Sequence, residues 1–281
     1  MRRFGLEALA LAATVLAPAA HADKPDMPAH AGEASKPPTI QTADLAAVAA
    51  RGAEIYAFDQ AAWHTTDAML ARKLPQDVMR AIRGWVVEPA GDLLTVTYYG
   101  LNDATPYAIY VADYRDGKIL NDRVPDTDGD RSLSAQAVRM AAAHDVAVAQ
   151  PFGACVERPF NTVTLPPRPG SGTIPVYLLT PMLKRDAYPA GGHHEVDIGP
   201  DGKLLAVRDF SKSCLTLDSP PDTKGLWMTH LLDPHPTEMH VYLSLWSGKP
   251  VFVGTPDDAV WSVNGTRIVK MDPKKGGAKE K

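Results

Sequence analysis

The sequence predicts an α+β protein, in which two or three helices pack on one or two antiparallel sheets and a β-meander follows. Two stretches, 43–56 and 132–146, repeat apolar residues at the spacing of one helical face. Many short runs instead alternate apolar and polar residues and are rich in β-branched and aromatic side chains, with 94–99 the clearest. Asp-Gly and Asn-Gly pairs between these runs favour tight hairpins, because glycine readily takes the positive φ that such turns need.

The first half of the chain starts with the helix predicted over 43–56. Gly52 falls on its apolar face and costs a helix about 1 kcal/mol relative to alanine. A short helix is expected over 77–83, whereas 57–76 shows no clear pattern. Strands are then expected at 85–87, 94–99, 107–112 and 119–120, with Asp116-Gly117 at the last hairpin.

The second half repeats this order, with a helix predicted over 132–146 and strands after it. These strands are expected at 161–165, 173–180, 193–198 and 204–207, with Asp201-Gly202 at the last hairpin. Beyond residue 221 the pattern becomes all-β, and Asn264-Gly265 is its clearest hairpin. The strands predicted there are 226–232, 238–245, 251–253, 260–263 and 266–269.

These boundaries divide the chain into six segments. We predict a signal peptide at 1–22, a disordered leader at 23–41, a first α+β unit at 42–130, a second α+β unit at 131–220, a β-meander packed on the second unit at 221–271, and a flexible tail at 272–281. An Asp-Gly-Lys hairpin follows the strands of both α+β units. This indicates either a weak internal repeat or two independent copies of a common turn.

The first 22 residues have the pattern of a cleavable export signal. Arg2 and Arg3 give a positive start, an apolar run follows at 8–15, and Ala20-His21-Ala22 offers small residues where a signal peptidase cuts. The apolar run is too short for the ~20 residues that cross a bilayer. Arg2-Arg3 also permits a twin-arginine signal, but the flanking residues favour the ordinary export route. We therefore expect a periplasmic or secreted protein without a membrane span.

Charge and cysteine content narrow the classes of function. The net charge of −4 at pH 7 gives the chain no general affinity for nucleic acid, so we expect no nucleic-acid partner. Cys155 and Cys214 are its two cysteines, and an even pair in an oxidising compartment predicts a disulfide. A bridge closing such a loop would stabilise the fold by about 4 kcal/mol. The alternative is a redox-active pair, but such pairs usually lie two residues apart.

The stretch from Cys155 to Cys214 contains Pro-Phe-Asn-Thr-Val at 159–163 and Gly-Gly-His at 191–193, and the segments 229–233 and 236–241 follow it. Together these segments resemble a group of uncharacterised exported proteins of Gram-negative bacteria, which implies export but no assigned activity.

A second resemblance rests on 113–120 and 197–205, each of which carries an Asp-Gly-Lys turn followed by two aliphatic residues. The helix-then-strands units that contain them are similar to PepSY-type modules. This resemblance implies protein binding or protease inhibition.

The sequence lacks the usual signatures of a catalytic nucleophile or a bound phosphate. It has no Gly-x-Ser-x-Gly elbow, no His-Glu-x-x-His helix and no glycine-rich phosphate loop. The stretch 126–130 starts like a calcium loop, but Arg131 and Ala137 stand where glycine and glutamate are required. We expect a solvated turn there, and we expect His64 with Asp67 to be a surface pair rather than a catalytic dyad.

Four side chains form a candidate metal site. His193 and Glu195 share one face of the strand expected at 193–198, and Glu238 and His240 share one face of the later strand. If these strands were neighbours, two imidazoles and a carboxylate would suit zinc or iron with an open position. The alternative is that these residues are the solvated faces of ordinary antiparallel strands, with aliphatic residues turned inward.

We predict a non-catalytic binding or envelope module without a cofactor, whose partner is a protein, a peptide or a small ligand in the cell envelope. The missing catalytic signatures and the PepSY-like pattern favour this hypothesis. The alternative is a metal-dependent hydrolase that uses His193, Glu195, Glu238 and His240 with zinc. Four aromatic residues serve either as core or as a ligand-binding platform: Trp227, Tyr242, Trp246 and Trp261.

Overall fold

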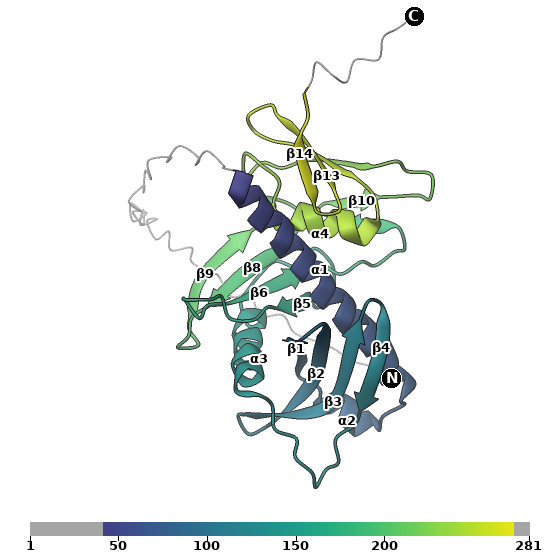
Figure 1. Cartoon of the computed structure of the whole chain (residues 1–281), viewed down its shortest axis with the longest axis vertical. Coiled ribbons are helices and arrows are strands. Elements are labelled where there is room, and N and C mark those ends of the chain that lie inside the picture. Colours follow the sequence, from purple (N-terminus) through teal and green to yellow (C-terminus); the bar gives the residue numbers. More distant parts are fainter. Residues whose placement is uncertain (1–41, 273–281) are drawn as a thin grey trace, which may run out of the picture. The chain divides into compact units, whose positions relative to one another are not determined.

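The computed structural model describes residues 42–272, which form four helices and fourteen strands (Figure 1). The α+β class is confirmed. The predicted signal peptide at 1–22, the leader at 23–41 and the tail beyond residue 272 lie outside the described residues. No helix within 42–272 is both long and apolar enough to cross a bilayer.

The first sheet is an antiparallel meander that follows two helices, α1 (Thr42–Ala71) and α2 (Gln76–Ala81). Its strands lie in sequence order: β1 (Gly84–Ala90), β2 (Leu93–Asn102), β3 (Thr105–Arg115) and β4 (Lys118–Arg123). The predicted hairpin at Asp116-Gly117 joins β3 to β4, and both residues have positive φ, 49° and 79°. The strands expected in this region are confirmed.

The second sheet is also antiparallel, and its strands follow helix α3 (Ala135–Val148) in the sequence. The N-cap of α3, Ser134, accepts a hydrogen bond from the Ala137 N–H. Its antiparallel strands are β5 (Asn161–Thr164), β6 (Ile174–Leu179), β8 (His194–Ile198) and β9 (Leu204–Asp209). The Asp201-Gly202 turn joins its last two strands, as Asp116-Gly117 does in the first sheet. Two short strands, β7 (Ala187–Pro189) and β10 (Thr216–Asp218), pair separately.

The third sheet is mixed rather than a pure meander. Its strands are β11 (Leu226–Thr229), β12 (Val251–Gly254), β13 (Val260–Asn264) and β14 (Arg267–Lys270), and β11 pairs with β12 in parallel. A parallel pair needs a crossover connection. Helix α4 (Glu238–Ser247) supplies it, so the prediction that 221–271 is all-β is wrong.

The strand predicted at 238–245 is therefore a helix. Its local signals are a capping box between Thr237 and His240 and a left-handed C-cap at Gly248, where φ is 65°. The alternating pattern is misleading because seven consecutive residues, from Glu238 to Ser244, are all buried. A helix buried on every side shows no solvent-facing stripe, and so it loses the period that identifies helices.

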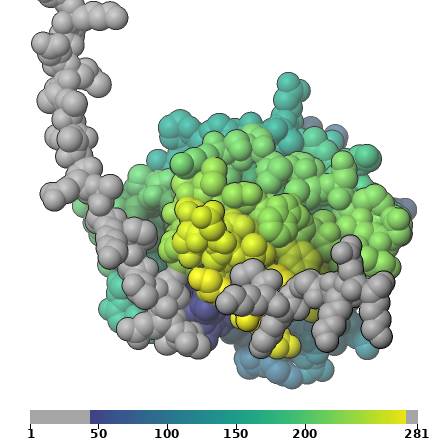
Figure 2. Space-filling view, turned by 90° about the horizontal axis from the view of Figure 1, so that it is seen from above, coloured from purple at the N-terminus to yellow at the C-terminus, as the bar shows by residue number. Residues whose placement is uncertain are grey.

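Helix α1 extends through the stretch that lacks a pattern, and its 30 residues contact each of the three four-stranded sheets (Figure 1). The second sheet lies between two helices. Val176 and Val196 on one face pack with α3, and Tyr177 and Leu179 on the other join the core around α1. Figure 2 shows the yellow residues of the third sheet against green residues of the chain's second half. Tyr188 packs against a further core cluster, which includes Val251 and Val263 of the third sheet.

Gly52 lies where α1 packs directly against α4. A Cβ at this position would lie 2.5 Å from the Val241 Cβ and 2.7 Å from the Glu238 carbonyl oxygen. Only a residue without a side chain permits two helices to come this close. The glycine that lowers the local helix propensity of 43–56 is thus a requirement of the tertiary structure.

The predicted disulfide between Cys155 and Cys214 is confirmed. Their Cα atoms are 5.5 Å apart, within the usual range for a bridge, and 59 positions separate them in sequence. The bridge ties the segment before β5 to the segment that follows β9.

We expect Gly52→Ala to destabilise the protein by about 1–3 kcal/mol, because the added methyl group overpacks the contact with Val241. At an exposed helix position the same change stabilises a protein by up to about 1 kcal/mol. The sign of the change in unfolding free energy therefore shows whether Gly52 is packed against α4. Urea unfolding followed by circular dichroism measures it. Ala50→Gly, at an exposed position of α1, is the control and should cost only about 1 kcal/mol. An unchanged or raised stability for Gly52→Ala would contradict this packing.

We expect replacement of both cysteines by alanine to lower the free energy of unfolding by about 4 kcal/mol, because the unfolded chain then loses its cross-link. Urea unfolding of the variant and of the oxidised wild type measures this difference. The reduced wild type should match the variant, and a loss below about 1 kcal/mol would show that the bridge contributes little.

Candidate functional site

A cavity of about 660 Å³ opens beside α1 and is lined mainly by aromatic and apolar side chains. Residues from α1, β1, β5 and α4 contribute to it, together with the segments before β5 and after β6. We call it the aromatic cleft and define it by Asp59, Gln60, Ala62, Trp63, Thr66, Trp85, Arg158, Pro159, Phe160, Asn161, Pro181, Met182 and Trp246. Its volume is within the range typical of small-molecule sites.

The walls of the cleft come from elements that are distant in sequence. On α1, the spacing of Asp59, Trp63 and Thr66 places them on one helical face. Trp85 stands on β1, with its ring 6.1 Å from that of Tyr98 on the next strand. Trp246, in the last turn of α4, is held by ring contacts at 5.4 Å and 5.3 Å with Tyr242 and Tyr188.

Asp59 is the acidic side chain of the cleft. Its Oδ2 accepts a hydrogen bond from the Tyr242 hydroxyl at 3.1 Å and a longer one from Gln60 at 3.4 Å. Among residues 42–272 the carboxyl forms no ion pair, and its Oδ1 accepts no hydrogen bond. Burial raises the pKa of Asp59 to about 6, although the hydrogen bonds from Tyr242 and Gln60 partly oppose this shift.

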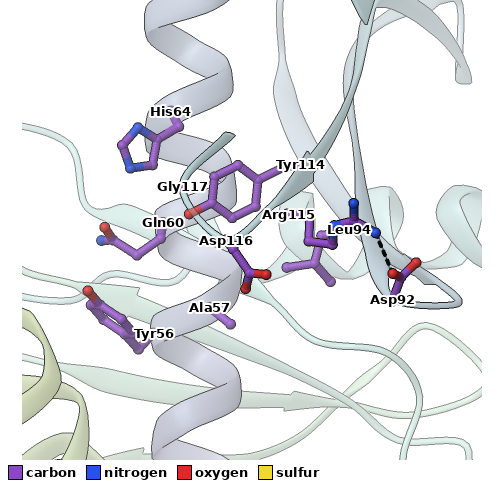
Figure 3. Close-up of a pocket in the computed structure, with 10 residues that line it drawn as sticks. All are labelled: Tyr56, Ala57, Gln60, His64, Asp92, Leu94, Tyr114, Arg115, Asp116 and Gly117. Carbon is purple, nitrogen blue, oxygen red and sulfur yellow. Dashed lines mark hydrogen bonds and ion pairs between the residues drawn. The ribbon is translucent and has the colours of Figure 1, made fainter. Parts of the chain in front are cut away.

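A second, smaller pocket of about 440 Å³ lies on the other side of Gln60 (Figure 3). Here α1 faces two of the three hairpins of the first sheet, β1–β2 and β3–β4, and the Tyr114 ring lies across from Gln60 and His64. His64 stacks on Tyr114 at 5.5 Å, and Arg115 forms an ion pair with Asp92 at the rim. Because Arg115 and Asp92 pair with each other and the volume is smaller, this pocket offers a ligand less than the aromatic cleft does.

Two of the four predicted metal ligands come together, away from both cavities. Glu195 from β8 and Glu238 from α4 meet at the hydroxyl of Tyr177, at oxygen–oxygen distances of 3.0 Å and 3.4 Å. Arg168 pairs with Glu195 at 2.6 Å, and Arg208 approaches Glu238 at 3.4 Å. The result is a buried charge-paired network that links the second sheet to α4.

The two predicted histidine ligands do not join these carboxylates. The Nδ1 of His193 accepts from the Thr180 N–H at 3.1 Å, and its Nε2 lies 3.2 Å from the Pro189 carbonyl oxygen. The Nδ1 of His240 accepts from the Thr237 N–H at 2.9 Å. Burial lowers the pKa of His193 to about 4 and that of His240 to about 3, so both rings are neutral.

In the part of the chain that the structure describes, no group of three or more His, Cys, Asp or Glu side chains is arranged to hold a metal ion. The predicted site required a strand at 238–245, on which Glu238 and His240 would share one face. The segment is instead a helix, and residues two apart on a helix point to different sides. The expectation that these side chains face water is also wrong, since Glu195, Glu238 and His240 are 7%, 6% and 3% exposed.

Neighbouring cations and hydrogen-bond donors compensate the negative charges of the carboxylates in and beside this network. Burial, and then the charge of Glu238, raises the pKa of Glu195. Burial opposes the charge of Asp233, yet the hydrogen bond from His230 and the positive charge of Arg208 hold its pKa at about 2. A network in which each carboxylate has a cationic or hydrogen-bonded partner is typical of a structural role.

The four aromatic residues near the end of the chain separate into different roles. Tyr242 and Trp261 are buried, Trp246 lines the aromatic cleft, and Trp227 is 56% exposed on β11. Sequence patterns missed Asp59 and Trp63, because 57–76 lacks a clear helical signal. A fuller search for an apolar face would continue through Phe58, which is buried in α1.

Comparison with protein-family models and with curated proteins gives no match. Two solved structures align weakly. A candidate lipoprotein from Clostridium difficile 630 is 15% identical over 51% of this chain and 91% of that chain, with a TM-score of 0.18. A bifunctional GH43-CE protein from Bacteroides eggerthii is 9% identical over 73% of this chain and 22% of that chain, with a TM-score of 0.14. TM-scores this low define neither a shared fold nor a shared function.

We expect Asp59→Asn to raise the free energy of unfolding by about 2 kcal/mol at pH 8, because it removes a half-buried charge but keeps an acceptor for Tyr242. The folded-state pKa of Asp59 lies above its ordinary value, so the wild type loses stability as pH rises from about 4 to 6. The gain should therefore shrink below about 1 kcal/mol at pH 4.5. Urea unfolding of both proteins at the two pH values measures it.

Asp67→Asn, at an exposed position of the same helix, is the matched control and should change stability by less than about 0.5 kcal/mol at either pH. A destabilised Asp59→Asn at pH 8 would show that the carboxylate is a structural requirement.

Proposed function

We propose that the protein is a non-catalytic binding module of the cell envelope or the secreted fraction, and that the aromatic cleft binds a small amphipathic ligand. The observation that carries this proposal is the cleft itself. It combines three tryptophans, one phenylalanine and a single unpaired carboxylate in a cavity of about 660 Å³. Apolar walls with a few placed polar groups are the usual composition of a ligand site.

The setting outside the cytoplasm is supported by two features of the chain. The disulfide between Cys155 and Cys214 belongs to an oxidising compartment, either the periplasm or the extracellular space. Residues 1–22 have the pattern of an export signal. We propose periplasmic or secreted localisation on this basis.

The resemblance to PepSY-type modules remains part of the proposal. In both α+β units, helices precede four antiparallel strands that lie in the sheet in sequence order: α1 and α2 in the first unit, and α3 in the second, whose sheet omits β7. The last hairpin of each unit carries Asp-Gly-Lys. This shared order supports the internal repeat, and it supports a binding role over a catalytic one.

We expect the neutral dye N-phenyl-1-naphthylamine to bind the protein with one-to-one stoichiometry and enhanced emission. Trp63→Ala should weaken this binding about fivefold, because an aromatic contact contributes about 1 kcal/mol. Trp63 is 54% exposed, so its replacement should leave the fold intact. Fluorescence titration measures both affinities.

Trp227→Ala is the matched control, because Trp227 is also exposed, at 56%, but lies outside the cleft. Its dye affinity should stay within about twofold of the wild type. Failure of the dye to bind, or an equal loss in the Trp227 variant, would refute a ligand site in the cleft.

A further inference from the structure

The carboxylate of Asp59 is a half-buried negative charge without a cationic partner. Removing a charge from water is costly unless another charge or several hydrogen bonds compensate it. The Tyr242 hydroxyl and Gln60 both donate to Oδ2, and no residue within 42–272 donates to Oδ1 of this cleft-lining carboxyl. Buried carboxylates elsewhere in the protein do have partners, as Glu195 has Arg168.

We propose that the aromatic cleft binds a small hydrophobic amine, whose ammonium group pairs with Asp59 and whose apolar part packs among the tryptophans. This inference rests on the proposed function and names the class of its ligand. The ammonium group would be the cationic partner that no residue within 42–272 provides for the Asp59 carboxylate. A cleft of about 660 Å³ accommodates a free small molecule.

The walls of the cleft favour a cation over a neutral ligand. Trp63, Trp85 and Trp246 present indole rings, and indole is the side chain that attracts cations most strongly through its face. Asp59 lies next to Trp63 by one helical turn, so the charge and an aromatic surface occur on the same side of α1. A carboxylate combined with aromatic rings is the arrangement that recognises organic ammonium groups.

The other titratable groups near Asp59 leave its charge dominant. Tyr242 from α4 and Tyr56 from α1 both have raised pKa values, mainly through burial, and they stay neutral at pH 7.5. Arg158 is the basic residue among those lining the cleft, and it is exposed at the rim. His64 lines the neighbouring pocket, not the cleft.

The test compares two probes of matched shape, phenethylamine and 2-phenylethanol, which differ in the ammonium group. Displacement of N-phenyl-1-naphthylamine gives both affinities. At pH 7.5 we expect the amine to bind about tenfold more tightly than the alcohol, as a charge-assisted contact should provide. At pH 5, where Asp59 is protonated, we expect this preference to fall below about threefold.

Asp59→Asn should abolish the preference at pH 7.5 while the alcohol still binds, and Asp67→Asn should retain it. Equal affinity of the two probes for the wild type, or a preference that survives Asp59→Asn, would overturn the inference and leave the ligand site intact. If neither the dye nor either probe binds, the proposed function itself fails.

Discussion

The close approach of α1 and α4 at Gly52 is the contact on which the rest of the structure depends. A side chain there would lie 2.5 Å from the Val241 Cβ, so glycine alone allows the two helices to meet. The local cost of glycine, about 1 kcal/mol, is offset by the apolar surface that the two helices bury together. Two turns further along α1, the same pair of helices brings Asp59 within hydrogen-bonding distance of Tyr242.

The buried and half-buried carboxylates of this protein have two kinds of environment, and the difference separates a structural network from a candidate site. Glu195 and Glu238 meet at one tyrosine hydroxyl, but Arg168 and Arg208 balance their charges. Asp59 has no such partner within residues 42–272. A carboxylate without a cationic partner in a cavity lowers the stability of the folded state. Proteins keep such a charge mainly where a ligand or a reaction requires it.

The cleft is assembled from rigid and irregular parts. Helices α1 and α4 supply Asp59, Trp63 and Trp246, whereas 158–161 belongs mostly to an irregular segment. That segment begins a few residues after Cys155, so the disulfide restrains one wall of the cleft as well as the unfolded chain. Restraint of a binding segment before the ligand arrives reduces the entropy lost on binding.

The sequence alone determined the α+β class, the hairpins and the cysteine pairing. Each depends on local or countable features, such as the positive φ of an Asp-Gly turn or the presence of two cysteines. Only the tertiary structure decided that 238–247 is a helix, because burial on all sides removed its helical period. It also decided the environment of Asp59, whose partner Tyr242 lies 183 positions away, a distance over which no local pattern carries information.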